Sequence, residues 1–232
     1  MELTFENAMH CDKCNNTGLV PVVENGRNMY AKCSCDAQRH SLIALKKSGL
    51  EDSISRFRFD NFVAKEDFQK RMLKLCRDFI AQKDSRFLYI SGQTGTGKTH
   101  LGTAVCEHFI SSGRTTLYIT FQQLMNEMKS AVNDEAYGDV LSRYGKAEVL
   151  YIDDFMRNEP TAADLKHTFE LINRRVVNRG ITIFTSEKSM EEIVGYDEAL
   201  GGRIMHMCGQ FCFCIGYKAG RNYRLKRKPE GV

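Results

Sequence analysis

The eight residues from 92 to 99 have types and a spacing that suit phosphate binding. They read Gly92-Gln93-Thr94-Gly95-Thr96-Gly97-Lys98-Thr99 and fit the pattern G-x-x-x-x-G-K-[ST] at every defined position. Glycines let backbone N–H groups face an anion, Lys98 would reach the β- and γ-phosphates, and the Thr99 hydroxyl would ligate Mg²⁺. With His100 directly after it, the stretch therefore predicts a binding site for ATP and Mg²⁺.

The residues around this stretch also suit a phosphate loop, which matters more than the pattern match. Residues 87–90 are a short apolar and aromatic run typical of a buried strand, and residues 99–111 indicate a helix that Gly113 ends. The alternative is a chance glycine-rich turn before a helix. Strand, loop and helix stand in the order that the motif requires, which favours the phosphate loop.

Two adjacent carboxylates end another apolar run. Asp153 and Asp154 follow the apolar residues 149–152 and lie 54 residues beyond Thr99. A buried parallel strand delivers such acids at the sheet edge where ligands bind. We expect Asp153 to hold Mg²⁺, through water, and Asp154 to orient or deprotonate the attacking water. Two adjacent aspartates can also simply end a strand, but their position after the phosphate loop favours a Walker B motif.

Polar residues also end the apolar run 181–186. If the sheet is wound as expected, the end of this strand brings Thr185, Ser186 and Glu187 beside the γ-phosphate. We expect Ser186 to take part in sensing or positioning that phosphate.

Four cysteines near the N-terminus have the spacing of a metal site. Cys11, Cys14, Cys33 and Cys35 form C-x2-C and C-x-C pairs with eighteen residues between them. Two such pairs can present four thiolates tetrahedrally to Zn²⁺, and residues 19–31 between them suit a hairpin. We predict a zinc module whose metal stabilises its fold, with an iron–sulfur site or four free cysteines as alternatives.

Nine cysteines without a secretion signal favour metal ligands or core thiols over disulfides. Cys208, Cys212 and Cys214 form a second cysteine-rich segment. Alternation along a buried strand explains it better than a second metal site, since free cysteine packs as a small apolar residue.

The remaining pattern predicts an α/β fold with a parallel sheet. Helices are expected over residues 36–47, 65–82, 121–132, 134–144, 162–178, 190–194 and 197–207, and further strands over 115–120, 210–216 and 222–226, before a frayed tail. Residues 50–62 form a connector, in which Phe57, Phe59 and Phe62 pack on the next domain or stack on an adenine or a base, with packing favoured. We divide the chain into a module at 1–48, a linker at 49–64 and an ATPase domain at 65–232.

Composition and charge narrow the class of protein. The chain of 232 residues is 42% hydrophobic and 27% charged, and no run approaches the roughly 20 apolar residues of a membrane span. An acidic start argues against a signal peptide, so we expect a cytoplasmic protein without a membrane partner. Residues 203–232 carry +6 while the rest carries −2, which indicates a nucleic-acid partner or a solvated tail.

Taken together, these motifs resemble the AAA+ helicase loaders and transposition helpers grouped as DnaC/DnaI/IstB. The resemblance is carried by residues 92–99, 150–155, 185–186, 199–205 and 222–224, and it covers most of residues 57–227. It implies a P-loop NTPase of AAA+ type with a five-stranded parallel sheet and no full lid. The cysteine-rich head resembles the zinc-binding N-terminal domain of DnaI-type loaders, which in that family contacts the replicative helicase.

The resemblance also implies partners and further site residues. It implies ATP-dependent assembly of the chain with itself on single-stranded DNA, and binding to a hexameric replicative helicase. A neighbouring AAA+ subunit supplies an arginine to the γ-phosphate, for which Arg203 is the best match and Arg224 the second. Either arginine could instead serve only a surface ion pair.

Two positions depart from the family pattern. Asp154 stands where most AAA+ proteins have Glu, although Asp-Asp is common in this loader group. Glu187 stands where the family usually has Asn, and an ionised carboxylate cannot donate a hydrogen bond and would repel the phosphate. Either Thr185 or Ser186 takes over the sensing role, or hydrolysis is slow.

Three functions therefore stay open at this point. The favoured one is a helicase-loader ATPase of replication, from a cell, a phage or a mobile element. The second is an IstB-like transposition helper that acts on duplex DNA. IstB-type proteins generally lack the cysteine head, which counts against it. The third is a nucleotide-gated adaptor with weak hydrolysis, which Glu187 supports.

Overall fold

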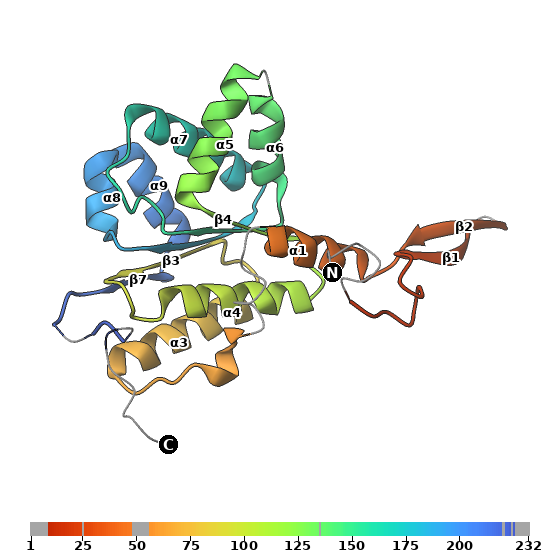
Figure 1. Cartoon of the computed structure of the whole chain (residues 1–232), viewed down its shortest axis with the longest axis horizontal. Helices are drawn as coiled ribbons and strands as arrows, with labels where there is room; N and C mark the ends of the chain where they lie inside the picture. The colour runs from red at the N-terminus through yellow and green to blue at the C-terminus, as the bar shows by residue number, and fades with distance from the viewer. Residues whose placement is uncertain are drawn as a thin grey trace.

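Five parallel strands form one sheet in the order β4-β5-β6-β3-β7 (Figure 1). The strands are β3 (Phe87–Gly92), β4 (Thr116–Thr120), β5 (Val149–Asp153), β6 (Ile181–Ser186) and β7 (Cys212–Ile215). The computed structural model describes residues 9–24, 26–47, 56–134, 136–219, 221–223 and 225, with backbone only at 44–47 and 133. The predicted α/β architecture with five parallel strands is confirmed.

Helices cover both faces of this sheet. One face carries α3 (Asp67–Ala81) and α4 (Lys98–Ser111); the other carries α5 (Phe121–Asn133), α6 (Tyr137–Lys146), α7 (Ala162–Val177), α8 (Met190–Tyr196) and α9 (Glu198–Cys208). Successive residues of β3 alternate between the two cores: Leu88 and Ile90 pack toward α3 and α4, whereas Phe87 and Tyr89 pack toward the other helices. Burial on both faces explains why β3 and β5 read as nearly continuous apolar runs.

The four-cysteine segment forms a hairpin followed by a helix. Strands β1 (Leu19–Glu24) and β2 (Arg27–Lys32) pair antiparallel and extend away from the sheet (Figure 1). Helix α1 (Asp36–Lys47) begins directly after Cys35 and packs against β4 and α4. Ser41 Oγ accepts a hydrogen bond of 2.8 Å from the Thr116 amide, so α1 satisfies a backbone donor at the β4 edge of the sheet.

Most predicted elements agree with the structure, and the differences lie near loops. Helix α6 begins at Tyr137 rather than at residue 134. The strand predicted over 222–226 is wrong at its described residues, which form a turn in which the Leu225 amide donates to Asn222 O at 3.1 Å. The Tyr223 amide instead donates to Gly95 O at 3.2 Å, so its hydrogen-bond partner is the phosphate loop and not a strand of the sheet.

Several sequence predictions fall outside the described residues: the acidic start, the connector before residue 56, Arg224 and the tail from residue 226. Within the connector, residues 56–62 pack on α4 and include a short 3₁₀ turn, η1 (Phe59–Asn61). Within the described ranges, none of the helices combines the length and apolarity needed to cross a lipid bilayer.

Candidate functional site

The phosphate loop joins β3 to α4 through three glycines with positive φ. Gly92, Gly95 and Gly97 have φ of 145°, 77° and 95°, a region that L side chains rarely adopt. Contacts add a second constraint at Gly97, where a Cβ would come within 2.8 Å of the Phe62 ring. The loop therefore keeps an open backbone cradle before the N-terminus of a fourteen-residue helix, the arrangement that binds phosphates in P-loop proteins.

The Lys98 ammonium lies within this cradle. It is nearly buried and donates hydrogen bonds to Gly92 O at 2.6 Å and to Gln93 O at 3.0 Å. A cation held on loop carbonyls at the mouth of a helix can exchange those bonds for phosphate oxygens. The predicted role of Lys98 thus has the geometry that it needs.

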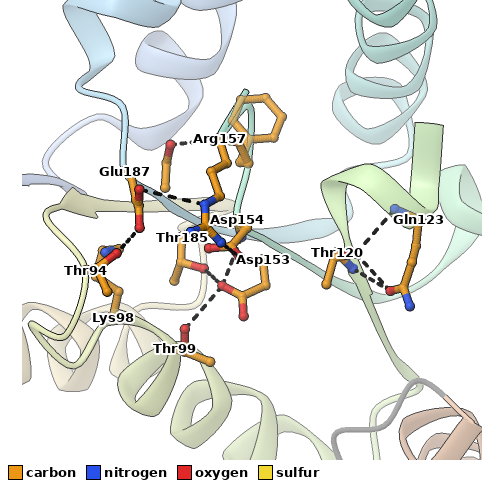
Figure 2. Close-up of polar contacts among 12 residues, drawn as sticks. Thr94, Lys98, Thr99, Thr120, Gln123, Asp153, Asp154, Arg157, Thr185 and Glu187 are labelled. Atoms are coloured by element: carbon orange, nitrogen blue, oxygen red, sulfur yellow. Dashed lines mark hydrogen bonds and ion pairs between the residues drawn. The ribbon is translucent and has the colours of Figure 1, made fainter. Parts of the chain in front are cut away.

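Asp153 ends β5 opposite the start of α4 (Figure 2). Its Oδ1 accepts hydrogen bonds from the Thr185 hydroxyl and, at 3.4 Å, from Thr99 Oγ1, and its Oδ2 accepts one from Tyr118 OH at 3.3 Å. A hydroxyl and a carboxylate oxygen that face each other are the hard ligands that Mg²⁺ prefers. Thr99 and Asp153 therefore fit the predicted magnesium site.

Asp154 has a different environment from its neighbour. Its backbone lies in the left-handed region at φ 50°, which turns the side chain away from the strand direction. Burial raises the pKa of Asp154 above its usual value, and the adjacent Asp153 carboxylate adds to the rise. A carboxyl with a raised pKa that borders a cleft is suited to accept a proton.

At the end of β6, Thr185 and Ser186, which the sequence left as alternatives for the sensing role, have different hydrogen-bond partners. Thr185 faces Asp153 and donates to its carboxylate (Figure 2). Ser186 faces the other way: its hydroxyl donates to Phe155 O at 2.6 Å and accepts from the Lys188 amide at 2.9 Å. The structure thus brings Thr185 to the Walker B carboxylate and does not bring Ser186 there.

The cleft beside the loop has a volume of about 530 Å³, within the usual range of ligand sites. It is bordered by Thr94, Gly95, Gly97, Lys98, Thr99, His100, Asp153, Asp154, Arg157, Glu187, Phe57 and Tyr223. Phe57 stacks on His100 with ring centroids 4.8 Å apart, and burial lowers the pKa of His100. A flat neutral wall of this kind suits a nucleotide base, whereas Phe59 and Phe62 pack into the core between α3 and α4.

Arg203, the first of the two candidate arginines, does not border this cleft. Arg203 lies on α9, on the face of the sheet opposite to α4, with its guanidinium 5.3 Å from the centroid of the Phe169 ring. Arg224 lies outside the described residues. If Arg203 contacts a nucleotide, that nucleotide is therefore expected in the cleft of a neighbouring subunit.

The four N-terminal cysteines come together as predicted. All four Sγ atoms lie within 4.8 Å of one another, with Cys14 to Cys35 at 3.5 Å and Cys11 to Cys33 at 3.8 Å. Thiolates at 2.3 Å from a tetrahedral Zn²⁺ would be separated by about 3.8 Å, so the cluster fits zinc. Arg39 Nε donates to Cys35 Sγ at 3.3 Å, the kind of outer contact that supports a metal thiolate.

The C-terminal cysteines do not form a second cluster of this kind within the described parts of the chain. Cys208 is buried in the core, and Cys212 and Cys214 alternate with Phe213 along β7. Cys214 Sγ is 2.8 Å from Ser91 Oγ on β3. Packing therefore accounts for Cys208 and in part for the half-buried Cys212, but the prediction of a buried strand is wrong at Cys214, which is exposed.

Two residues of the site were missed by the sequence reasoning. Tyr118 on β4 reaches Asp153 across the sheet, and Arg157 contacts both Asp154 and Glu187. The strand order would have suggested Tyr118, because β4 pairs with β5. Arg157 depends on a turn with positive φ at Asp154 and Met156, for which the sequence carries no glycine signal.

Comparisons with known proteins agree with this geometry. A family model described as IstB-like ATP binding protein matches residues 35–230. Phage-like element PBSX protein XkdC of Bacillus subtilis (strain 168) is 30% identical over an alignment of 237 positions, which covers 96% of this chain and 87% of that protein. The replicative helicase loader DnaC of Escherichia coli (strain K12) is 24% identical over 163 residues, covering 68% of this chain and 65% of that protein.

The solved structure of a DnaC helicase loader has the same fold. It superposes with a TM-score of 0.61 at 20% identity and covers 71% of this chain and 98% of that chain. The family match begins at residue 35, so the cysteines at 11, 14 and 33 lie before it.

Proposed function

The chain belongs to the IstB-like ATP-binding protein family, and from that premise we propose that it is an ATP-dependent helicase loader of DNA replication. In this proposal it binds ATP in the cleft, hydrolyses it, and engages a replicative helicase and single-stranded DNA. The observation that carries the proposal is the combination of a P-loop site with a four-cysteine module attached to the P-loop helix through α1.

The cleft residues divide the work of ATP hydrolysis. Lys98 and the loop amides hold the phosphates, and Thr99 and Asp153 hold Mg²⁺, which neutralises charge on the phosphates when bound. Asp154 orients the attacking water and accepts its proton. Thr185 positions the Asp153 carboxylate through its hydrogen bond.

The four-cysteine module contacts the helicase. The hairpin exposes large apolar side chains, including Val23 and Tyr30, which are 73% and 74% exposed. Exposed apolar residues of this size are enriched at protein interfaces. Helix α1 joins this surface to the phosphate-loop domain, since Gln38 Nε2 donates to Ser111 O at the end of α4 at 3.1 Å.

The DNA partner is a single strand held by basic residues, and assembly of several chains completes each nucleotide site. The basic balance of residues 203–232 supports an anionic partner. The relative DnaC is described as a replicative helicase loader, which supports the helicase partner.

A transposition helper is the second candidate, because the matching family model is named for IstB. The family match does not extend over Cys11, Cys14 and Cys33. These three cysteines cluster tightly with Cys35, which favours the helicase loader. A preference for duplex over single-stranded DNA would favour the transposition helper.

The proposal is tested by ATP turnover with no DNA, with single strands and with duplex, in the wild type, in Lys98→Ala and in Lys65→Ala. Lys65 is an exposed residue before α3 and serves as the charge-matched control. We expect single strands to stimulate turnover in the wild type and in Lys65→Ala but not in Lys98→Ala. Tight ATP binding without turnover would leave the nucleotide-gated adaptor, and no ATP binding would contradict the proposal.

The helicase contact is tested in the same preparations by capture of a hexameric replicative helicase. We expect Cys14→Ser to lose bound zinc and helicase capture while ATP binding stays. Cys76→Ala, which removes a buried thiol of α3, should keep both. Capture that survives the loss of zinc would contradict a helicase contact through this module.

A further inference from the structure

A carboxylate lies against the phosphate loop, where an anion is unfavourable. Glu187 follows β6, and its Oε1 accepts a hydrogen bond from the Thr94 hydroxyl in the loop (Figure 2). Asp153 and Asp154 border the same cleft, so three carboxylates surround the space in which a triphosphate would lie. Such a cleft needs compensating positive charge before it can bind another polyanion.

Arg157 supplies this charge from the turn after β5. Its Nη1 lies 3.4 Å from Asp154 Oδ2, and its Nε lies 3.9 Å from Glu187 Oε2. The turn is built for this approach: Asp154 and Met156 have φ of 50° and 48°, and the Arg157 amide donates to Asp154 O at 3.2 Å. The side chain therefore folds back over the end of its own strand (Figure 2).

The contacts form a continuous chain from the loop to the Walker B motif. Thr94 bonds Glu187, Glu187 pairs with Arg157, and Arg157 pairs with Asp154. The side chains of Arg157, Asp154 and Glu187 are 56%, 44% and 30% exposed, so all three are reachable from the cleft. Among the described residues that border the cleft, the lysine is Lys98 and the arginine is Arg157, so these two side chains supply its positive charge.

We propose that Arg157 is a positioning residue of the nucleotide site. Its guanidinium neutralises Glu187 and so allows the cleft to accept a γ-phosphate next to Glu187. The proposal rests on the proposed function, because it requires that the cleft binds ATP. Without Arg157, Lys98 would be the only lysine or arginine left along the described cleft. An isolated surface ion pair would contribute little, but this pair decides whether Glu187 repels the incoming phosphate.

The proposal separates ATP from ADP. The third phosphate adds negative charge next to Glu187. An uncompensated Glu187 should therefore weaken the binding of ATP more than the binding of ADP. A variant that merely disturbed the fold would weaken both nucleotides alike. The ratio of the two dissociation constants is therefore the informative quantity, and it does not depend on hydrolysis.

The experiment is isothermal titration calorimetry with Mg²⁺ and either a non-hydrolysable ATP analogue or ADP. The variants are Arg157→Ala, Arg157→Lys, Glu187→Gln and the double variant Arg157→Ala/Glu187→Gln, with Arg77→Ala on the exposed side of α3 as the charge-matched control. We expect Arg157→Ala to weaken the ATP analogue at least about fivefold and ADP less than about twofold, and Arg77→Ala to change neither. Arg157→Lys, which keeps the charge, should stay close to the wild type.

Rescue by the second substitution decides the mechanism. If Arg157 acts by neutralising Glu187, the double variant should bind the ATP analogue within about twofold of the wild type. A double variant as weak as Arg157→Ala would overturn the proposal, as would a loss in Glu187→Gln equal to that in Arg157→Ala. A wild type that binds neither nucleotide would instead refute the proposed function, and this inference with it.

Discussion

Adjacent aspartates at the end of β5 have different environments, and this difference assigns different tasks to them. Asp153 is buried and accepts hydrogen bonds from three hydroxyls, so its charge is fixed in place for a cation. Asp154 is half-buried in a left-handed turn and contacts Arg157. A base needs a pKa nearer to the working pH, and burial raises the pKa of Asp154 in that direction.

This assignment predicts the acidic limb of the pH profile of turnover. The pKa of Asp154 is raised by burial, and further by Asp153 and Glu187, while Arg157 and Lys98 act in the opposite direction. Because the base is active when ionised, activity should fall as the pH drops through this raised pKa, at a higher pH than for an ordinary aspartate. Glu187→Gln should move the limb to lower pH.

The measurement is kcat against pH at saturating ATP, beside ATP affinity over the same range. Asp154→Asn should lower kcat by about a hundredfold or more at neutral pH while ATP still binds. An acidic limb that stays unchanged in Glu187→Gln would contradict the role of Asp154 as the titrating base.

At the scale of elements, a buried arginine joins α7 to the starts of two strands. Arg175 is fully buried, with Nε donating to Thr182 Oγ1 at 3.1 Å and Nη1 donating to Tyr144 O at 3.2 Å, and with further bonds to Ala147 O and Ile181 O. Its pKa is lowered to about 10 by burial, so it stays charged at neutral pH. These bonds hold the β5 and β6 end that lies away from the nucleotide.

Replacing this side chain should therefore cost stability without touching the cleft. Arg175→Met leaves several carbonyls without their donor, and we expect the free energy of unfolding to fall by about 3 kcal/mol. Urea denaturation followed by circular dichroism measures it, with the exposed neighbour Arg174→Met as control, for which less than about 1 kcal/mol is expected. Equal stability of the two variants would show that water replaces the guanidinium.

Elements with local signals were predictable from the sequence, and contacts between distant segments were not. The phosphate loop and the helix from Asp36 to Lys47 follow from glycines, caps and apolar spacing within a few residues. The choice of Thr185 over Ser186 depends on how the end of β6 turns relative to β5, which alternation alone does not reveal. The turn at Asn222 was wrongly predicted as a strand because its partner is the phosphate loop.

The contact between Glu187 and Arg157 is another contact between distant segments that the sequence does not predict. From the sequence, a carboxylate after Thr-Ser predicts repulsion of the phosphate, since nothing nearby in the chain carries a positive charge except Lys188. In the fold, Arg157 reaches it from thirty residues upstream through a turn with two non-glycine residues in the left-handed region. If Arg157 neutralises Glu187 as proposed, the carboxylate does not by itself slow hydrolysis.

At the scale of the whole molecule, α1 connects two functional surfaces. The helix starts at the cysteine cluster and runs beside β4 and the end of α4, whose other end holds Lys98 (Figure 1). Ser41 bonds both the Thr116 amide and Arg114 O, at 2.8 and 3.5 Å. If the hairpin binds the helicase as proposed, α1 connects that contact to the β4 edge of the sheet through these hydrogen bonds.

Arg203 lies away from the nucleotide cleft of its own chain. It lies on α9, across the sheet from α4, and does not border the described cleft. If Arg203 completes the site of the next subunit, a chain lacking Lys98 still offers Arg203 to its neighbour, and a chain lacking Arg203 still offers an intact cleft. Lys98→Ala and Arg203→Ala should therefore be inactive alone, with Arg203→Ala losing about a thousandfold in kcat, and regain part of the turnover when mixed.

Turnover of the two variants is measured separately and in equal mixture, under conditions in which the wild type assembles on single-stranded DNA. Arg77→Ala mixed with Lys98→Ala is the control for dilution by an inactive chain. Full activity of Arg203→Ala alone would reduce its role to the contact with Phe169. A mixture that co-assembles but stays inactive would place Arg203 in the site of its own chain, against its position on the far face of the sheet. Recovery requires that one cleft receive its lysine from one chain and its arginine from another, which only a shared site allows.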